Sequence, residues 1–399
     1  MTVRSDPRVA RGPVQRAERA LAPDLARGAM LLIIALANAA GVALAGEPGV
    51  EPSPEGAERG FNLLMFTFVH ARGYPVFALM FGYGLVQLYR RQQAAGAAPA
   101  VARSVLLRRN AWLVAFGLAH ATLLYYGDFL GAYGIVGLVM TLVLLRRSDR
   151  THRFVLWIWA LFVAEVLVIG VLVVLAILRG GGSAGVANEH IGSLAAPDYP
   201  HSLLDRLGEW PAHTATVLPF ILIVWLGTWA ARRRILEEPA RHLKLLRWTA
   251  AGGLGIAVAG GLPQALLSAG LLRVDESAAS LMSMLYGASG MFAGPGYAAL
   301  IGLVAVRVSR KTTGPVTGAL AALGRRPLSG YLFQSVAWLV LLAPYTLALG
   351  EKFGSPSLTA AVLAVLVWLA SVAVARLLDR RGLSGPAERL LRRLTYGSR

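Results

Sequence analysis

The residues of this chain that could do chemistry lie inside or at the edges of long apolar runs. Asp24 and Arg27 stand at the start of the first run, and Asn38 lies about 20 Å further along if the run is helical at about 1.5 Å per residue. An isolated charge costs about 2.5 to 3.5 kcal/mol at a bilayer centre, so an acid and a base at its boundary are expected to neutralise each other. They would then either line a water-filled cavity or simply cap and anchor the helix.

A second group of polar residues, formed by His70, His120 and Asp128, lies near the opposite ends of the next apolar runs. Imidazole has an unperturbed pKa of about 6.5, which suits proton transfer near neutral pH, and a carboxylate can orient the ring. Asp128 is therefore expected to act with one of these histidines, and it could pair with His70 if the second and fourth runs meet. Either His70 or His120 would accept a proton from a substrate. The alternative is that each histidine binds lipid headgroups at the interface.

Arginines gather at the ends of the runs where Asp24 lies. Arg27, Arg109 and Arg325 each stand within a turn or two of a run's boundary. Because guanidinium groups bind phosphate well, these side chains predict an anion site that suits a diphosphate-bearing donor such as coenzyme A. The alternative is the general enrichment of Lys and Arg in the cytoplasmic loops of membrane proteins.

Composition defines the class of protein. With 56% hydrophobic and 15% charged residues, the chain is too apolar for a soluble domain. Its apolar runs approach the ~20 residues that cross a bilayer, which predicts an all-α polytopic membrane protein. The basic residues behind the net charge of +18 lie in short loops between the runs, as is usual for the cytoplasmic loops of membrane proteins. No nucleic-acid partner is therefore expected. Without cysteine, and without phosphate-loop, dinucleotide-binding or His-Glu-x-x-His motifs, the sequence predicts no metal site.

The distribution of basic residues predicts the topology. If ten spans alternate, most of the 39 Lys and Arg residues fall on the side of two basic tails, 1–24 and 378–399. Both termini are therefore expected in the cytoplasm, and the long segment 179–213 outside. The domain between the tails, residues 25–377, would hold ten transmembrane helices. The expected spans are 25–46, 62–89, 105–125, 129–145, 154–178, 212–231, 248–272, 281–306, 328–349 and 357–377.

Several stretches resemble the YeiB-like bacterial membrane proteins, the family of domain of unknown function 418. The first run carries Asp-x-x-Arg-Gly at 24–28 followed by Asn38, and the second carries Phe-Gly-Tyr-Gly at 81–84. Further matches are Gly-Asp-Phe-Leu at 127–130 and Gly-Arg-Arg-Pro-Leu-Ser-Gly-Tyr-Leu-Phe-Gln-Ser at 324–335. The resemblance runs from residue 20 to the C-terminus. It implies a multi-pass protein of the bacterial inner (plasma) membrane.

The spacing in the first run is also similar, more distantly, to that of the heparan-glucosaminide acetyltransferases and other membrane acyltransferases. Those enzymes take acyl groups from cytoplasmic acyl-CoA and deliver them across the membrane, using a His on the far side. The resemblance implies a donor site that is formed by Asp24, Arg27, Arg109, Arg325 and Gln334. This chain departs from the YeiB-like pattern where it has His-Ala-Arg at 70–72 in place of the usual Glu-Gly-Lys.

We therefore expect a membrane acyltransferase with acyl-CoA as co-substrate and no tightly bound cofactor. Asn38 would orient the acyl carbonyl, and His70 or His120 would take the acceptor's proton. The expected partners are the bilayer, a small-molecule or cell-envelope glycan or lipid acceptor, and a second copy of the chain in a homodimer. The alternative is a transporter of a small anionic or amphipathic solute, in which Glu165 or Asp128 is coupled to protons.

Overall fold

The protein is described by a computed structural model that covers residues 20–309 and 314–397. Within these ranges it is helical, apart from a short antiparallel pair formed by β1 (Gly46–Glu47) and β2 (Glu189–His190). The predicted all-α class is therefore confirmed. Of the expected N-terminal tail, residues 1–19 lie outside the described ranges, and the first helix already begins at Leu21.

Many of the helices begin with proline at the first helical position, where the fixed φ suits a helix and the missing N–H would have no intrahelical partner. The elements are α1 (Leu21–Ala43), α2 (Ala57–Leu64), η2 (Met65–Val69), α3 (Gly73–Ala94), α4 (Pro99–Leu123), α5 (Leu130–Val139), η3 (Met140–Leu144), α6 (Asp149–Arg179), α7 (Gly192–Ala195), α8 (Tyr199–Val217), η4 (Leu218–Phe220), α9 (Ile221–Arg232), η5 (Pro239–His242), α10 (Leu243–Ser268), α11 (Glu276–Gly290), α12 (Ala293–Ser309), α13 (Pro315–Gly324), α14 (Pro327–Leu341), α15 (Leu349–Lys352), α16 (Pro356–Arg380) and α17 (Pro386–Tyr396).

Seven helical segments of the described chain are long and apolar enough to cross a bilayer, so by helix length and composition this is a multi-pass membrane protein. They coincide with the predicted spans one, two, five, six, seven, eight and ten. The other three predicted spans fall on α4, which carries several arginines, and on the shorter α5–η3 and α14. Helices suit these runs because the backbone N–H and C=O groups find no water in the bilayer core and must form hydrogen bonds with each other.

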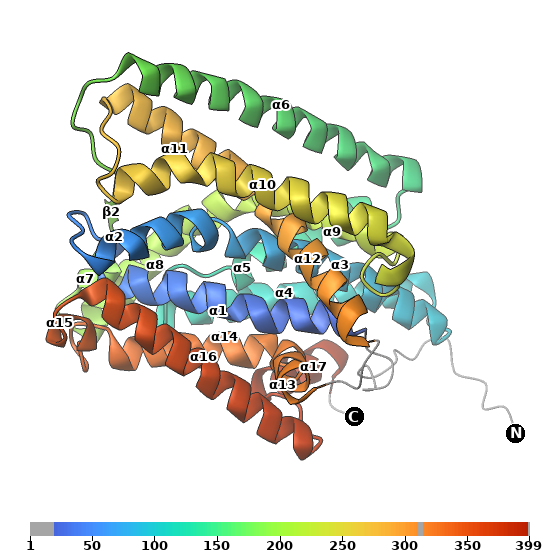
Figure 1. The fold of residues 1–399 in the computed structure, drawn as a ribbon. Helices are drawn as coiled ribbons and strands as arrows, with labels where there is room; N and C mark the ends of the chain where they lie inside the picture. Colours follow the sequence, from blue (N-terminus) through green and yellow to red (C-terminus); the bar gives the residue numbers. More distant parts are fainter. Residues whose placement is uncertain (1–19, 310–313, 398–399) are drawn as a thin grey trace, which may run out of the picture.

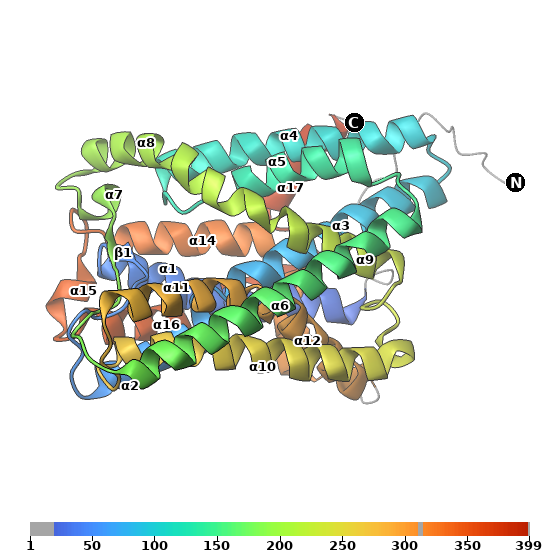
Figure 2. The same cartoon turned by 90° about the horizontal axis from the view of Figure 1, so that it is seen from above.

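The helices form one bundle with α1 in its interior (Figure 1). In that view α6 lies along one margin and α16 along the other, while Figure 2 shows α4, α5 and α8 on one side and α10 on the opposite side. The end of the bundle at which α1 begins and α3 ends is called the arginine end below. The opposite end, which carries β1, β2, α7 and α15, is called the β end.

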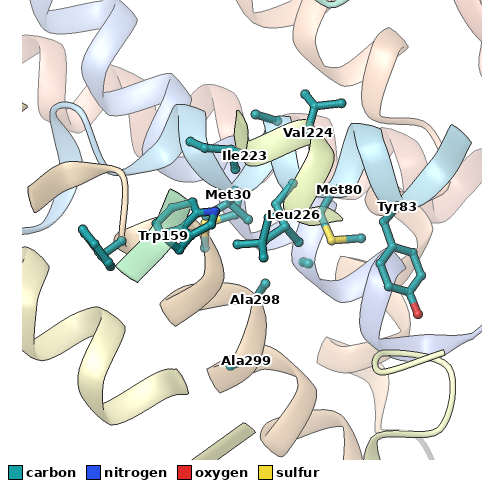
Figure 3. Close-up of a cluster of buried hydrophobic side chains, with 14 of the residues drawn as sticks. Met30, Met80, Tyr83, Trp159, Ile223, Val224, Leu226, Ala298 and Ala299 are labelled. Carbon is teal, nitrogen blue, oxygen red and sulfur yellow. The ribbon is translucent and has the colours of Figure 1, made fainter. Parts of the chain in front are cut away.

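The largest cluster of buried apolar side chains in the described residues joins most of the long helices. Met30 of α1, Met80 of α3 and Trp159 of α6 pack together with Leu226 of α9 and Ala298 of α12 (Figure 3). Lipid tails are as apolar as these side chains, so close packing, more than removal from water, holds such helices together. The cluster fixes α1 and α3 relative to each other, and both helices carry residues of the candidate site.

Two glycines let α1 and α13 cross with their backbones in contact. A Cβ atom added to Gly28 would lie 2.1 Å from the Leu320 carbonyl oxygen, and one added to Gly324 would lie 1.7 Å from that of Asp24. Real Cβ atoms do not approach so closely, so any larger residue would push the helices apart. The close crossing of α1 and α13 therefore requires a glycine in each of the two motifs, 24–28 and 324–335.

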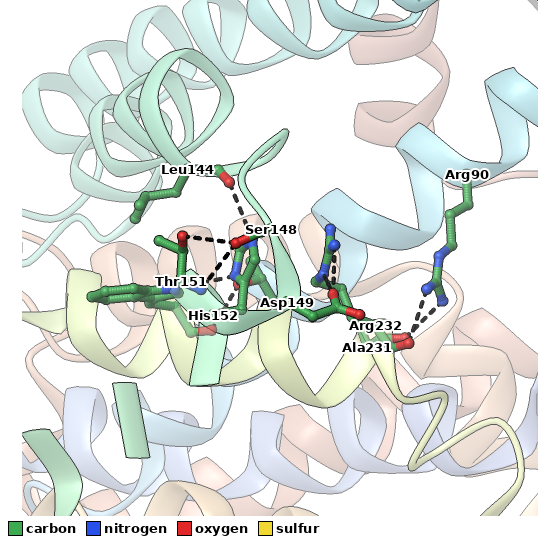
Figure 4. A network of polar contacts seen from close by, with 10 residues as sticks. Arg90, Leu144, Ser148, Asp149, Thr151, His152, Ala231 and Arg232 are labelled. Atoms are coloured by element: carbon green, nitrogen blue, oxygen red, sulfur yellow. Dashed lines mark hydrogen bonds and ion pairs between the residues drawn. The ribbon is translucent and has the colours of Figure 1, made fainter. Parts of the chain in front are cut away.

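Polar contacts at the arginine end connect α6, α9 and α3 (Figure 4). The Ser148 hydroxyl caps α6 by accepting a backbone N–H, and Asp149 forms an ion pair with Arg232 at 2.6 Å. Arg90 of α3 donates to the Ala231 carbonyl oxygen at 3.0 Å, at the C-terminus of α9. These contacts hold the Arg90 guanidinium at the arginine end, where the candidate site opens.

Two segments that we expected as an outer loop, 179–213, and as a C-terminal tail, 378–399, contain helices. Within 179–213, α8 begins at Tyr199 and packs against α4, where the Tyr199 hydroxyl donates to the Leu123 carbonyl oxygen at 3.0 Å. Within 378–397, α17 packs against α4 and α14 and buries Leu391. Both segments therefore belong to the folded bundle.

Replacement of Gly324 by Ala should destabilise the protein, because the new Cβ atom overlaps the Asp24 carbonyl oxygen. Overpacking of this kind typically costs about 1 to 3 kcal/mol. The matched control is Gly255→Ala in α10, where a Cβ atom meets nothing within 4 Å, so the better helix propensity of alanine should be neutral or slightly stabilising. The thermal midpoint of the detergent-purified variants, followed by tryptophan fluorescence, checks this. Equal midpoints would contradict the backbone contact.

Candidate functional site

A cavity of about 620 Å³ runs from the arginine end toward the middle of the bundle. Its lining begins at Pro23 of α1 and Arg91 of α3, and it ends at Ile34, Tyr74 and Tyr331. From Pro23 to Ile34 it follows α1 for roughly 17 Å, at 1.5 Å per residue. The volume falls within the range of about 300 to 1,000 Å³ that small-molecule sites occupy.

The mouth of the cavity is cationic. Asp24 and Arg27 of the first-run motif face each other there, with Oδ1 and Nη1 3.5 Å apart, and the Arg109 guanidinium lies over the Phe81 ring at 5.8 Å. Guanidinium groups arranged around one opening attract phosphate or carboxylate groups. The arginines that line the cavity are Arg27, Arg90, Arg91, Arg109 and Arg234.

Two further acids in the lining have structural partners. Glu237 accepts hydrogen bonds from the Tyr83 hydroxyl and from Gln87 Nε2, the latter at 3.0 Å. Glu388 of α17 accepts the backbone N–H of Leu328 at 2.8 Å and so caps the N-terminus of α14. Because both carboxylates already accept hydrogen bonds from the protein, we assign them a structural role at the mouth of the cavity.

The deep part of the cavity is aromatic. Tyr74 stacks on Phe129 with ring centroids 4.3 Å apart, and Phe81 stacks on Tyr133 at 5.4 Å. The cavity thus passes from a charged mouth to an interior that suits an apolar chain. The aromatic lining consists of Tyr74, Phe77, Phe81, Phe129, Tyr133 and Tyr331.

A buried serine, histidine and aspartate lie behind the last of these rings. The Tyr331 ring stands 4.8 Å from the His120 ring. His120 Nδ1 lies 2.9 Å from Asp128 Oδ1, and His120 Nε2 lies 2.8 Å from Ser335 Oγ. The exposed fractions are 2% for His120, 0% for Asp128 and 1% for Ser335. Three segments, α4, the α4–α5 turn and α14, contribute one residue each.

The contacts of Asp128 assign the proton on His120. Asp128 accepts the backbone N–H groups of Leu130 at 3.1 Å and Gly131 at 2.7 Å, at the N-terminus of α5. A carboxylate only accepts hydrogen bonds, so the His120 Nδ1 nitrogen must carry the proton that is donated to it. In a neutral imidazole the Nε2 nitrogen then has a lone pair that faces the Ser335 hydroxyl, whose proton can be donated to Nε2 or to the Tyr331 carbonyl oxygen.

Two buried amide side chains, those of Asn38 and Gln334, lie close to the inner end of the cavity. Asn38 follows Ile34 by one turn on α1, and its Oδ1 atom is buried without a hydrogen-bond partner in the described chain. Gln334 of α14 donates to the Leu31 carbonyl oxygen at 3.3 Å and ties α14 to α1. Neither amide lines the cavity itself, so Gln334 positions the helices instead of contacting a ligand in the mouth.

His70 has a different environment from the one expected. Its Nε2 atom lies 3.2 Å from the Gly49 carbonyl oxygen, and the described residues give it no contact with Asp128, which pairs with His120 instead. The neighbouring Arg72 is buried against backbone carbonyls, including that of Ala257 at 2.9 Å. The break between η2 and α3 places both side chains on the α10–α11 side of the bundle, outside the cavity lining.

Arg325, another expected donor residue, does not line this cavity. Its Nη2 atom forms an ion pair with Asp379 Oδ1 at 2.7 Å, and Arg326 shares the same oxygen at 3.3 Å. Asp379 belongs to α16 and is 4% exposed. This cluster joins the α13–α14 turn to α16 at the arginine end.

Three residues of this region had no predicted role: Tyr331, Ser335 and Glu237. Tyr331 and Ser335 stand four residues apart, so they share one face of α14, and that spacing was visible in the 324–335 motif. Glu237 gave no signal, because in the sequence it is one acid in a charged loop. Its position under Tyr83 depends on the crossing of α3 and α9.

Comparisons with known proteins found one family match and several distant relatives. Residues 230–398 match the family described as "Protein of unknown function (DUF418)". The chain is also 26% identical to the uncharacterized protein YxaH of Bacillus subtilis, over 84% of this chain and 81% of YxaH. The same identity relates it to the uncharacterized protein YeiB of Escherichia coli, over 95% of this chain and 96% of YeiB.

The C-terminal part of the chain, residues 230–398, is therefore similar to the DUF418 family. The DUF418 match begins in α9 and includes Tyr331 and Ser335, whereas the likeness of the part that carries His120 and Asp128 rests on the relatives aligned over most of the chain. The names of these relatives state no activity. The geometry of the cavity is therefore the basis for a functional proposal.

Loss of the Asp379 carboxylate should destabilise the protein, because Arg325 and Arg326 would keep their charges without it. Breaking a fully buried pair from one side costs about 3 to 5 kcal/mol, and the cost should be smaller here because Arg325 is partly exposed. The control is Asp149→Asn, whose partner lies at the surface and whose loss should cost about 0 to 1 kcal/mol. Thermal midpoints of Asp379→Asn and Asp149→Asn that fall equally would contradict a structural role for the Arg325 cluster.

Proposed function

We propose that the protein is a membrane acyltransferase, which takes an acyl group from cytoplasmic acyl-CoA and passes it to an acceptor across the bilayer. The observation that carries the proposal is the single cavity that leads from a guanidinium-lined mouth to an aromatic interior beside His120. Of the expected donor residues, Asp24, Arg27 and Arg109 line this cavity. The proposal therefore keeps these three and assigns Arg325 and Gln334 to the surrounding structure.

The two parts of the cavity match the two parts of an acyl-CoA. Its phosphates would pair with the guanidinium groups of Arg27, Arg90 and Arg109 at the arginine end. The thioester and its acyl chain would lie among the aromatic rings, with the carbonyl carbon near Tyr331. This orientation leaves the acyl group at the innermost point of the cavity, closest to His120.

His120 is the better base of the two histidines that the sequence offered. Asp128 holds the His120 Nδ1 atom, so in the neutral ring the Nε2 atom would be the one that takes a proton. In the transfer, an acceptor hydroxyl or amine forms a bond to the acyl carbon, the carbon–sulfur bond breaks, and the thiol leaves with a proton. Asp128 positions the imidazole and stabilises its charged form, and Asn38 would stabilise the developing oxyanion.

An anion transporter remains the competing function, since the same mouth would bind a small anion. Proton-coupled transport would require a titratable group that the solute or a proton can reach. Glu165, the acid proposed for that coupling, is exposed on α6 and does not line the cavity. Asp128 is engaged by His120 and by two backbone amides. These positions favour acyl transfer over proton-coupled transport.

Replacement of Arg109 by Gln should weaken binding of acetyl-CoA about tenfold or more, because a hydrogen bond to a charged group contributes about 1.5 to 3 kcal/mol. Arg325→Gln is the matched control and should bind as the parent does, since its charge faces Asp379. Isothermal titration of both variants in detergent at two salt concentrations measures the effect. Weaker binding in Arg325→Gln alone, or none in the parent, would refute the donor site.

The proposal needs the arginine end in the cytoplasm. Because the chain has no cysteine, single cysteines at Gln93, exposed just past the arginines of α3, and at Ser183, exposed after α6, can report the topology. An impermeant maleimide should label Ser183→Cys in intact cells and Gln93→Cys only after permeabilisation. The reverse pattern would place the mouth of the cavity outside and exclude a cytoplasmic donor.

A further inference from the structure

The arrangement of Ser335, His120 and Asp128 contains more than a general base. The serine hydroxyl lies 2.8 Å from His120 Nε2, the histidine lies 2.9 Å from the carboxylate, and two backbone N–H groups hold that carboxylate in place. This is the order of groups that activates a serine: a hydroxyl, a base within hydrogen-bond distance, and a third group that orients the base. The hydroxyl also lies 3.3 Å from the Tyr331 carbonyl oxygen in its own helix.

We propose that Ser335 is a nucleophile that carries the acyl group as an ester between the donor and the acceptor. The inference rests on the proposed function, because it names the intermediate of that transfer. Two half-reactions would suit a protein whose donor and acceptor approach from opposite sides of a bilayer, since the two substrates need not meet. The acyl group would cross the innermost part of the protein attached to α14.

The chemistry balances without any further reactant. In the first half-reaction Ser335 Oγ bonds to the thioester carbon, His120 Nε2 takes the hydroxyl proton, the carbon–sulfur bond breaks, and the leaving thiolate receives that proton. In the second, an acceptor hydroxyl or amine attacks the serine ester, His120 takes its proton, and the carbon–oxygen bond to Ser335 breaks. The proton then returns to Ser335 Oγ, and the enzyme is regenerated.

Access to Ser335 depends on Tyr331. Tyr331 is the α14 residue at the end of the cavity, and Ser335 is one helical turn further on the same face. The Tyr331 hydroxyl contacts the Gly127 carbonyl oxygen at 3.4 Å and the backbone of Phe129. Because the Tyr331 ring stands between the cavity and His120, the proposal requires this side chain to move for the thioester to reach the serine. Asn38, one turn beyond Ile34, lies beyond the same end of the cavity on α1.

A purely structural role predicts different behaviour. In that case the three side chains would only clamp α14 to the α4–α5 turn, and the serine would have ordinary reactivity. A fluorophosphonate distinguishes the two roles, because it reacts with an activated serine by displacement of fluoride from phosphorus and needs no coenzyme A. The probe should label the detergent-purified full chain on a single peptide that contains Ser335, identified by mass spectrometry of the parent protein.

The variants make the assignment specific. Ser335→Ala should reduce labelling to background, and His120→Gln should slow it about 100-fold or more, the usual contribution of a general base. The control is Ser371→Ala, which removes another buried hydroxyl that is bonded to its own helix, and it should label as the parent does. No label on the parent, or label that persists in Ser335→Ala, would overturn the nucleophile.

The inference and the proposed function can fail separately. Radiolabelled acetyl-CoA, added without acceptor and then quenched in denaturant, should leave label on Ser335. If fluorophosphonate labels Ser335 while acetyl-CoA neither binds nor transfers its acetyl group, the nucleophile stands and the proposed donor is wrong. If acetyl-CoA is turned over equally by the parent and a folded Ser335→Ala variant, the donor stands and the nucleophile is wrong.

Discussion

The burial of the Asp128 carboxylate is the constraint on which the rest of the site depends. With no exposed surface, this group must be satisfied by the protein, and it is satisfied by two N–H groups of α5 and by the His120 ring. Those contacts fix the side of the imidazole that carries a proton. They also turn the other nitrogen toward α14, where Ser335 meets it.

Contacts at the ends of the neighbouring helices determine the position of α14. Glu388 of α17 caps its first turn, and the contact between Gly28 and Gly324 brings α13, and the turn that leads to α14, against α1. The same crossing sets Asp24 and Arg27 at the mouth of the cavity. One arrangement of helices therefore determines both the cationic opening and the depth at which the serine and histidine lie, which is why the two motifs belong together.

The sequence predicted the helical class and seven of the ten proposed spans, because apolar length and turn residues are local signals. It also indicated polar residues within the helices, such as His120 and Arg27, and one at a helix edge, Asp128. It did not predict which of them meet: Asp128 contacts His120 and not His70, and Arg325 faces Asp379, more than fifty residues away, instead of the cavity. Such pairings depend on the order in which helices pack, and one sequence without relatives contains no signal for that order. Ser335 was missed because a serine in an apolar helix usually bonds to its own backbone.

The central claim is that the acyl end of a coenzyme A donor reaches the innermost part of the cavity. Bromoacetyl-CoA tests this claim directly, since a cysteine thiolate displaces bromide and forms a thioether that holds the acetyl-CoA group on the protein. In this cysteine-free chain a cysteine at Ser335 should be alkylated, and coenzyme A should protect it, whereas one at the equally buried Ser371 should stay unmodified. Equal modification at both positions, or none at Ser335, would contradict the account.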